Sequence, residues 1–372
     1  MQYRKFGNTG IEISALGFGC MRFPTINVNG RQEIDEEEAV KMLRHGIDEG
    51  INYIDTAYVY HDGKSEGLVG RALKDGYRDK VYVATKSPVW MIKEPEDFDR
   101  YLDEQLARLD MEYIDFYLLH ALDLDRWNNL ILKKDLLTKM EQAKASGKIR
   151  HIGFSFHDDA DAFLTILNGY NSWDFCQIQM NYIDVNNQAT LRGLEAAAAK
   201  GLGVIIMEPL LGGKLANPPE NVKQVLRDDK TPVEWALDFL WNRPEVSLLL
   251  SGMSAMQHTT DNLLYAGRSG IGMLSKEDLS MLAHAKEIYD TMALVSCTKC
   301  AYCMPCPFGL DIPKTFEAYN RTATAGTEEA QKLYNTLDKK ADACRKCRKC
   351  EQVCPQSIKI SEVMIKVNEI FS

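Results

Sequence analysis

The sequence predicts a (β/α)8 barrel followed by a small, cysteine-rich helical domain. Two observations support this. Between residues 16 and 251, short apolar runs alternate with longer amphipathic segments, and eight of the ten cysteines lie from Cys297 to Cys354. The length of 372 residues exceeds the usual size of a single core, which fits a barrel with an appended domain. The composition, 45% hydrophobic and 26% charged, is that of a globular chain.

Eight apolar runs are the expected barrel strands: residues 16–20, 52–55, 81–85, 114–119, 149–154, 175–179, 203–207 and 247–250. Helical spacing marks intervening segments such as residues 36–49, 96–109, 136–146 and 191–200. Gly50, Gly147 and Gly201 each follow one of these segments and would end a helix there. A doubly wound open sheet is the alternative, but eight units favour the closed barrel.

The two ends of the barrel segment can also be predicted. Residues 3–13 are expected to form two short strands around a turn at Gly7 and Asn8, a hairpin that would plug the bottom of the barrel. A helix is expected at residues 276–292, and the composition then changes abruptly at Cys297. We therefore expect a barrel domain of residues 1–294 and a cysteine domain of residues 295–372.

Charge and hydropathy exclude several classes of protein. The net charge of −9 argues against a nucleic-acid partner, which needs a basic face. The start, MQYRKFGNTG, lacks the pattern of a signal peptide, and there is no run of eighteen apolar residues. We expect a cytoplasmic protein that does not associate with a membrane.

Polar residues follow three neighbouring strands at the end where barrel enzymes place their chemistry. Asp55 ends the second strand, with Tyr60 in the loop beyond; Lys86 ends the third and His120 the fourth. Reduction of a carbonyl by hydride needs a proton donor, and tyrosine is too weak an acid unless a nearby cation lowers its pKa. Lys86 can be that cation and Asp55 can hold it, while His120 can orient the carbonyl oxygen.

Each of these four residues alone would more often be a surface or salt-bridging group. Four complementary side chains at matching strand ends favour catalysis. The substrate would be a small carbonyl compound or alcohol. Met21, Arg22, Trp90 and Tyr182 are candidate residues of the barrel mouth, and each is equally explained as packing.

Several segments resemble signatures of the aldo-keto reductase superfamily over about residues 1–290: LGFGCMRFP, INYIDTAYVYHDGKSEGLVGRAL, VATKSP, YIDFYLLHA and IRHIGFSFHD. The resemblance implies a TIM barrel that binds NADPH along its later strands. It also implies a catalytic tetrad that falls on Asp55, Tyr60, Lys86 and His120.

The same resemblance assigns the cofactor contacts. Ser155 and Gln177 match the family's amide-binding serine and glutamine, and Met207 stands where many members stack an aromatic ring on the nicotinamide. Asp261 and Asn262 match adenosine-end residues. Gly252 and His258 replace the lysine and arginine of NADPH-preferring members, so the choice between NADP(H) and NAD(H) stays open.

The cysteines form two similar runs. Cys344, Cys347, Cys350 and Cys354 precede Pro355 with the C-x2-C-x2-C-x3-C-P spacing of bacterial ferredoxins. The first run, Cys297, Cys300, Cys303 and Cys306, has two residues before its last cysteine instead of three. Two structural zinc ions are the alternative, and disulfides are less compatible with a reducing cytoplasm. We expect two [4Fe-4S] clusters.

In the ferredoxin arrangement, the fourth cysteine of each run binds the other cluster. This predicts one cluster on Cys297, Cys300, Cys303 and Cys354, and a second on Cys344, Cys347, Cys350 and Cys306. A helical insert at residues 312–343 would pack beneath them. Cys20 and Cys176 fall in barrel strands and are expected to be buried small hydrophobic residues.

The second run is interleaved with four cations, Arg345, Lys346, Arg348 and Lys349. They would offset cluster charge and dock an acidic electron carrier such as ferredoxin or flavodoxin, although a solvated charge run is the simpler reading. The tail resembles the ferredoxin-like extension of one branch of aldo-keto reductases, in CTKCAYCMPCPFGLDIP and ACRKCRKCEQVCPQ.

The sequence thus predicts an oxidoreductase that reduces a carbonyl, or oxidises an alcohol, with a nicotinamide cofactor and is coupled to iron-sulfur electron transfer. Clusters pass single electrons and cannot accept a hydride, so a flavin or another two-electron group would have to connect the two. No flavin motif is visible in the sequence. The alternative is a redox-sensing regulatory barrel protein whose clusters are structural or signalling.

Overall fold

The eight expected strands form a closed parallel barrel in the computed structural model, which describes residues 1–292, 294–324 and 326–371. The largest difference from a predicted boundary is three residues, at the end of the fourth barrel strand (119 expected, 122 observed). In barrel order the strands are β10 (Phe175–Gln179), β11 (Gly203–Met207), β12 (Leu248–Ser251), β3 (Leu16–Gly19), β6 (Tyr53–Asp55), β7 (Tyr82–Ser87), β8 (Ile114–Leu122) and β9 (Ile149–Phe156). Because these strands are buried on both faces, they are continuous apolar runs, which is why the sequence reveals them.

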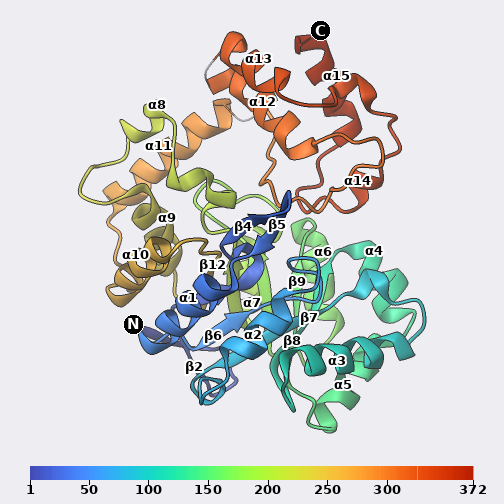
Figure 1. The fold of residues 1–372 in the computed structure, drawn as a ribbon. Coiled ribbons are helices and arrows are strands. Elements are labelled where there is room, and N and C mark those ends of the chain that lie inside the picture. Colours follow the sequence, from blue (N-terminus) through green and yellow to red (C-terminus); the bar gives the residue numbers. More distant parts are fainter. Residues whose placement is uncertain (293, 325, 372) are drawn as a thin grey trace. The chain divides into compact units, whose positions relative to one another are not determined.

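Helices lie outside the barrel strands (Figure 1). They are α1 (Glu36–Asp48), α2 (Ser65–Ala72), α3 (Glu96–Leu109), α4 (Leu124–Arg126), α5 (Leu136–Ala145), α6 (Ala160–Gly169), α7 (Thr190–Ala199) and α10 (Met256–Gly267). Short helical turns complete this part, among them η3 (Val89–Met91) and η4 (Trp127–Leu132).

The chain folds as two compact units. One contains Met1–Pro209 and Leu237–Leu274, and the other contains Leu210–Ala236 and Ser275–Ser372. All barrel strands belong to the first unit and all eight clustered cysteines to the second. Helix α9 (Pro232–Trp241) contains the junction between Ala236 and Leu237.

The predicted N-terminal hairpin plugs the bottom of the barrel. Strands β1 (Tyr3–Lys5) and β2 (Glu12–Ser14) pair antiparallel, and the loop between them inserts Phe6 into the core formed by the first residues of several strands. The Phe6 ring lies 5.0 Å from that of Phe116 and 5.7 Å from that of Phe175. Gly7 has a positive φ of 53°, and a Cβ there would be 2.4 Å from the carbonyl oxygen of Gly201, so only glycine fits.

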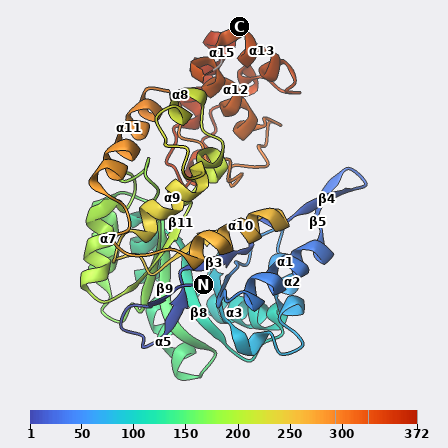
Figure 2. The ribbon, with the colours of Figure 1, turned by 90° about the vertical axis from the view of Figure 1, so that its left-hand side faces the viewer.

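A second hairpin was not expected. Strands β4 (Thr25–Val28) and β5 (Arg31–Ile34) pair antiparallel around Asn29 and Gly30, both with positive φ, and extend away from the barrel strands (Figure 2). The Asn-Gly pair is a strong signal for a two-residue hairpin turn. Most side chains of both strands are exposed, so the sequence has no alternating apolar pattern that would predict these strands.

The cysteine-containing unit is helical. Its helices are α8 (Glu220–Lys223), α11 (Lys276–Met292), α12 (Ile312–Thr324), α13 (Thr327–Asn335), α14 (Lys349–Gln352) and α15 (Ile360–Phe371). The predicted helical insert is thus two helices and the short turn η6 (Ala341–Ala343). An apolar core joins α12, α13 and α15, where the rings of Tyr334 and Phe371 stack at 4.3 Å, and six of the cysteines pack against it. No helix of the described residues is long and apolar enough to cross a membrane.

Candidate functional site

The structure brings the four predicted catalytic residues together at one end of the barrel. Strands β6, β7 and β8 are neighbours with parallel register, and Asp55, Lys86 and His120 lie at their carboxyl ends. Tyr60 follows β6 in the adjoining loop. All four residues are buried, Lys86 completely and Tyr60 to all but 8% of its surface.

Lys86 occupies the centre of this group. Its Nζ donates to Asp55 Oδ1 at 2.6 Å and to the Thr56 carbonyl oxygen at 2.7 Å, and it lies 4.9 Å from the centroid of the Tyr60 ring. Burial raises the pKa of Asp55, and the neighbouring ammonium opposes that shift. A fully buried cation is stable only when paired and hydrogen-bonded, so Asp55 and the backbone fix the position of the ammonium beside Tyr60.

His120 faces the same tyrosine. The two rings meet edge to face at 6.1 Å, and the Trp90 ring lies 5.0 Å from His120 on another side. Burial, with the charge of Lys86 as a smaller cause, holds the pKa of His120 well below its ordinary value, so the imidazole is neutral at pH 7. Its Nδ1 is buried and has no hydrogen-bond partner among the described residues.

A buried polar network behind the tetrad holds Lys86 in place, and the sequence did not reveal it. Gln105 Nε2 donates to Glu66 Oε1 at 2.6 Å, to Thr85 Oγ1 at 3.0 Å and to the carbonyl oxygen of Lys86 at 3.1 Å. Thr85 Oγ1 donates to Glu66 Oε1, and Tyr117 donates to Gln105 Oε1, both at 2.7 Å. These hydrogen bonds fix the backbone of the strand that carries the Lys86 ammonium.

One signal could have found this network. In α3 the buried positions Phe98, Leu102 and Leu109 form an apolar stripe, and Gln105 occupies the same stripe. A polar residue on the buried stripe of a helix must find partners inside the protein, because an unpaired buried amide is costly.

The predicted cofactor residues lie in two places, on barrel strands and on helix α10. Gln177 is buried with its Oε1 unpartnered among the described residues, and its Nε2 is 3.6 Å from the sulfur of Met207. Ser155 Oγ accepts from the backbone N–H of Ala121 at 2.7 Å, which leaves its own O–H free to donate. These three residues lie on neighbouring strands β9, β10 and β11.

The two residues assigned to the adenosine end lie on α10. Asn262 is buried and donates to Ser251 Oγ at 3.0 Å, so it ties the helix to the end of β12. Asp261 accepts from Gln257 Nε2 at 2.7 Å near the surface of the same helix.

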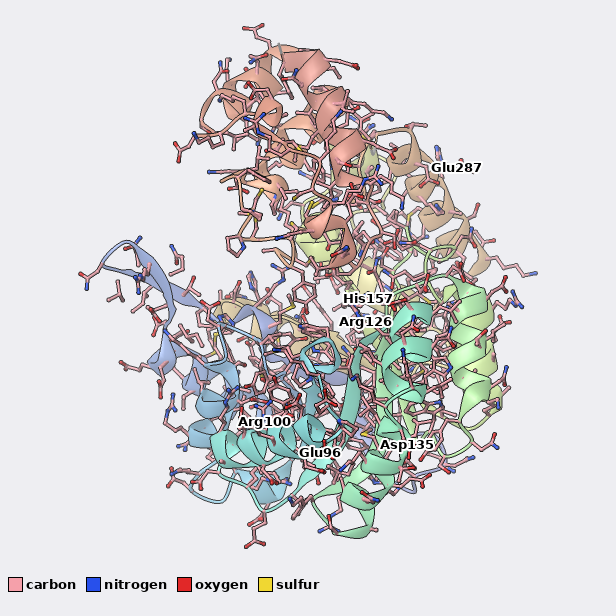
Figure 3. All side chains as sticks on the ribbon, turned by 90° about the vertical axis from the view of Figure 1, so that its right-hand side faces the viewer. Glu96, Arg100, Arg126, Asp135, His157 and Glu287 are labelled. Carbon is pink, nitrogen blue, oxygen red and sulfur yellow. The ribbon has the colours of Figure 1, made fainter. Side chains whose placement is uncertain are left out.

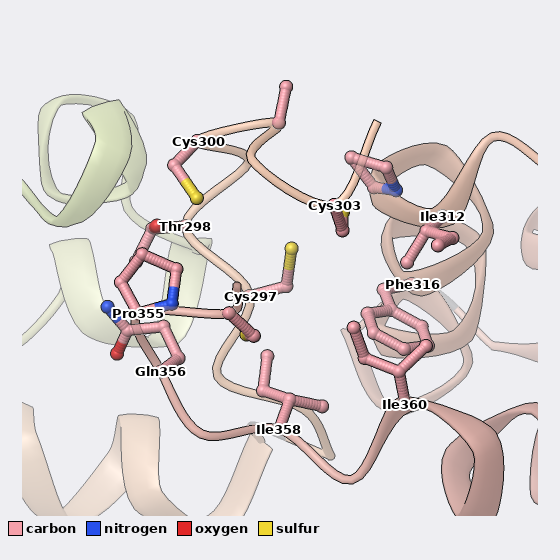
Figure 4. A pocket seen from close by; sticks show the side chains of 13 residues that line it. Cys297, Thr298, Cys300, Cys303, Ile312, Phe316, Pro355, Gln356, Ile358 and Ile360 are labelled. Atoms are coloured by element: carbon pink, nitrogen blue, oxygen red, sulfur yellow. The ribbon is translucent and has the colours of Figure 1, made fainter. Parts of the chain in front are cut away.

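In the second unit, the cysteines of the first predicted set line one pocket. Cys297, Cys300, Cys303 and Cys354 enclose it, together with apolar side chains that include Ile312, Phe316, Ile358 and Ile360. Figure 4 shows the sulfur atoms of Cys297 and Cys300 pointing into the enclosed space. Burial raises the pKa of the Cys303 thiol to about 12, and the charges of the other three cysteines contribute.

The second predicted set is more open. Cys306, Cys344 and Cys350 pack against the helical core, and Cys347 is exposed. Burial raises the pKa of the Cys350 thiol to about 11, with smaller contributions from the nearby Cys344 and Cys306. All ten cysteines are free of disulfide bonds. No three or more His, Cys, Asp or Glu side chains in the described ranges come together as a site for a single metal ion.

The two runs share an unusual backbone. Lys299 and Ala301, the second and fourth residues after the first cysteine of their run, have φ of 57° and 64°. Lys346 and Arg348 hold the same positions in the second run, with φ of 52° and 58°. Residues other than glycine seldom adopt this region, and a left-handed residue next to a right-handed one can turn successive backbone N–H groups toward an anion. The repetition indicates that both loops are shaped for the same kind of group.

Comparison with known sequences decides the family. A sequence model of the aldo/keto reductase family matches residues 15–285, and one of the 4Fe-4S dicluster domain matches residues 293–358. The first match covers more than half of the chain. The chain belongs to the aldo/keto reductase family. It is an oxidoreductase whose C-terminal part is a 4Fe-4S domain.

Among curated relatives of this aldo/keto reductase, L-galactose dehydrogenase of Arabidopsis thaliana is 29% identical over 288 residues, 71% of this chain and 87% of that protein. Probable aldo-keto reductase 1 of Glycine max is 32% identical over 159 residues, 41% of this chain and 44% of that protein.

The fold is that of solved aldo-keto reductases. The holo form of one from Bacillus halodurans gives a TM-score of 0.63 at 23% identity, covering 77% of this chain and 96% of that one. One from Klebsiella pneumoniae, described in complex with NADP and acetate, gives 0.62 at 24% identity, covering 76% and 94%.

Two further side chains of the reductase mouth were not singled out from the sequence. Arg126 on α4 and His157 just after β9 lie close together beyond the strand ends (Figure 3). His157 Nδ1 is 3.2 Å from Gln188 Oε1. Burial lowers the pKa of His157 to about 4, and the Arg126 charge acts in the same direction.

The low pKa of His157 predicts a pH-dependent stability. The folded histidine stays neutral down to about pH 4, whereas the unfolded one takes up a proton below its ordinary 6.5. The unfolding free energy of the native chain should therefore fall, relative to that of His157→Gln, as the pH drops from 6.5 toward 4. Urea titrations of both proteins at about pH 7.5, 6 and 5 measure this difference. A difference that does not change with pH would contradict it.

Proposed function

We propose that the barrel transfers a hydride between NADP(H) or NAD(H) and a small carbonyl compound or alcohol, with Tyr60 as the proton donor and acceptor. The observation that carries the proposal is the buried Lys86 ammonium, fixed by Asp55 at 4.9 Å from the Tyr60 ring. A cation at this place favours the phenolate and so makes Tyr60 a stronger acid. The tyrosine can then give its proton to the oxygen that develops negative charge.

The other residues orient the substrate. Neutral His120 can donate a hydrogen bond to the carbonyl oxygen next to Tyr60, because its ring carries one N–H and its Nδ1 has no partner within the described ranges. Asp55 pairs with the Lys86 ammonium and fixes its position in the buried site. In the reverse direction, the alcohol would give its hydroxyl proton to the Tyr60 phenolate and the hydride on its carbon to the oxidised nicotinamide.

The residues at the ends of β9, β10 and β11 fit a nicotinamide. Its carboxamide offers an N–H donor for the unpartnered Oε1 of Gln177 and an acceptor for the Ser155 hydroxyl, while Met207 offers an apolar surface to the ring. When bound, the reduced nicotinamide supplies the hydride to the carbonyl carbon. The NADP in the Klebsiella pneumoniae neighbour supports this class of cofactor. We assign the adenosine end to Asp261 and Asn262 on α10, and this assignment does not choose between NADP(H) and NAD(H).

The proposal predicts the effect of removing one hydroxyl. Tyr60→Phe should lower kcat by about 10²- to 10⁴-fold while nicotinamide binding, measured by fluorescence titration, stays unchanged. Tyr58→Phe is the matched control, since the Tyr58 hydroxyl bonds Glu104 at 2.7 Å outside the tetrad. A Tyr60→Phe enzyme with native turnover would remove Tyr60 from the chemistry.

We propose further that the C-terminal domain, residues 295–372, holds two [4Fe-4S] clusters with exchanged fourth cysteines. The pocket that joins Cys354 to the first three cysteines of the other run supports the first set. The packing of Cys306, Cys344 and Cys350 against one helical core supports the second. The matching positive φ values in both runs support two groups of one kind.

Paired serine variants test the exchange. Cys297→Ser with Cys354→Ser removes two ligands of one proposed cluster and should halve the iron content of anaerobically purified protein. Cys297→Ser with Cys306→Ser removes one ligand from each and should deplete both clusters. The single variant Cys297→Ser is the control and should keep about half of the iron. The opposite pattern in the two double variants would show that each run binds its own cluster.

Coupling between the two units completes the proposal. Single electrons from the clusters and a hydride from the nicotinamide can be exchanged only through a two-electron carrier such as a flavin. Arg345, Lys346, Arg348 and Lys349 are exposed around Cys347, which supports docking of an acidic electron carrier such as ferredoxin or flavodoxin. A reducing cytoplasm would keep the cluster thiols available for iron.

A further inference from the structure

We propose that the substrate of the barrel carries a carboxylate, which Arg126 binds at the barrel mouth. The inference rests on the proposed hydride transfer and names the substrate class for it. Arg126 ends α4, six residues after His120 in the chain. Its guanidinium carbon lies 5.6 Å from the centroid of the Trp90 ring, and that ring lies 5.0 Å from His120. Arginine, indole and imidazole therefore form one continuous wall next to the proposed carbonyl site.

The backbone before Arg126 is built to present this side chain. Strand β8 has a register shift between Leu119 and Leu122, and Ala121 within it has a φ of 55°. Ser155 Oγ accepts the Ala121 N–H at 2.7 Å, which stabilises the irregular peptide, and the Ala121 carbonyl oxygen accepts a hydrogen bond from Arg126 Nη1. Bulges next to active sites often redirect a side chain.

Helix α4 adds a second restraint. Asp123 Oδ1 accepts the backbone N–H of Arg126 at 2.7 Å, and Asp123 Oδ2 lies 3.4 Å from the Arg126 Nη1. The stacked and hydrogen-bonded guanidinium has little freedom left to lose on binding an anion, so binding costs less conformational entropy than at a mobile surface arginine.

One edge of the guanidinium is left for a ligand. Nη1 makes both contacts described above, whereas Nε and Nη2 bond no residue in the part of the chain that the structure describes. Only 17% of the Arg126 side chain is exposed, so water access to this edge is limited. Two parallel N–H donors in a fixed plane match the two oxygens of a carboxylate, and such bidentate, charge-assisted pairs are among the strong hydrogen bonds of proteins.

Nearby charges do not cancel this preference. Lys86 is paired with Asp55, and both His120 and His157 are held neutral, partly by the Arg126 charge itself. Asp123 offsets Arg126 through Nη1 only, at 3.4 Å, and the neighbouring carboxylates Asp125 and Asp158 form no ion pair with the guanidinium in the part of the chain that the structure describes. The substrate class that fits is an oxo acid, reduced to the hydroxy acid: the hydride adds to the carbonyl carbon, the Tyr60 proton adds to its oxygen, and NAD(P)⁺ leaves.

The test compares acids with their neutral amides. Glyoxylate, 4-oxobutanoate and 5-oxopentanoate are assayed against the corresponding primary amides. The three acids differ in the distance between the carbonyl and the carboxylate, so the series also finds the spacing that the site accepts. For the best acid, Arg126→Met should lower kcat/KM by about 10- to 100-fold and change that of its amide by less than about twofold. Arg126→Lys keeps the positive charge but loses the two parallel N–H donors of the guanidinium. Its kcat/KM for the acid should lie between those of the native enzyme and Arg126→Met.

Arg100→Met on α3 is the matched control. Arg100 is also stacked on an aromatic ring, 4.2 Å from the centroid of Tyr101, and also paired with carboxylates, Asp97 at 2.6 Å and Glu104 at 3.2 Å. Arg100 lies on helix α3, apart from Arg126 (Figure 3). Arg100→Met should leave the ratio of acid to amide unchanged. Equal losses on acid and amide in Arg126→Met would show a structural role and overturn the proposal.

Binding separates this inference from the proposed function. Native protein that reduces neither acids nor amides would refute hydride transfer. The carboxylate site is then judged by calorimetry of the full-length protein with butanoate and butanamide, which cannot be reduced. Tighter binding of butanoate that is lost in Arg126→Met supports the site, and equal binding of both compounds, or binding that Arg126→Met does not change, overturns it.

Discussion

The ammonium of Lys86 has no exposed surface, and the architecture of this end of the barrel follows from the need to keep the charge there. A buried charge that loses its partner costs about 3–5 kcal/mol, so Asp55 and the Thr56 carbonyl are requirements of the fold as well as of the proposed chemistry. The Gln105 and Glu66 network secures the same strand from behind. Because β6, β7 and β8 are joined in register, fixing Lys86 also fixes the position of Asp55 and the place where His120 meets Tyr60.

Burial also shifts the pKa values of the titratable side chains at this end of the barrel. In the proposed mechanism, the tyrosine beside the buried ion pair gives a proton and the neutral histidine orients an oxygen. Ordinary surface residues would be screened by water and would not shift one another in this way. Burial is therefore the common cause of the pKa shifts at Asp55, His120 and His157.

The sequence predicted what depends on strong local patterns. The eight buried strands were visible as apolar runs, and Asp55, Lys86 and His120 were visible because each stands at the end of such a run. The hairpin of β4 and β5 was not predicted, because its strands are exposed and carry no apolar alternation. Arg126 was also missed. Its proposed role depends on a bulge in β8 and on a contact with Trp90, and neither leaves a periodic signal in the sequence.

The central claim is that the barrel end formed by Asp55, Tyr60, Lys86 and His120 transfers a hydride, and isotope transfer tests it most directly. The reductase is supplied with a carbonyl substrate and with NADPH or NADH deuterated at either face of the nicotinamide C4, and the alcohol is examined by mass spectrometry and NMR. Deuterium from one of the two faces on the carbinol carbon is the predicted result. An alcohol that forms without deuterium from either face would show that its hydrogen comes from another donor, and would contradict the account.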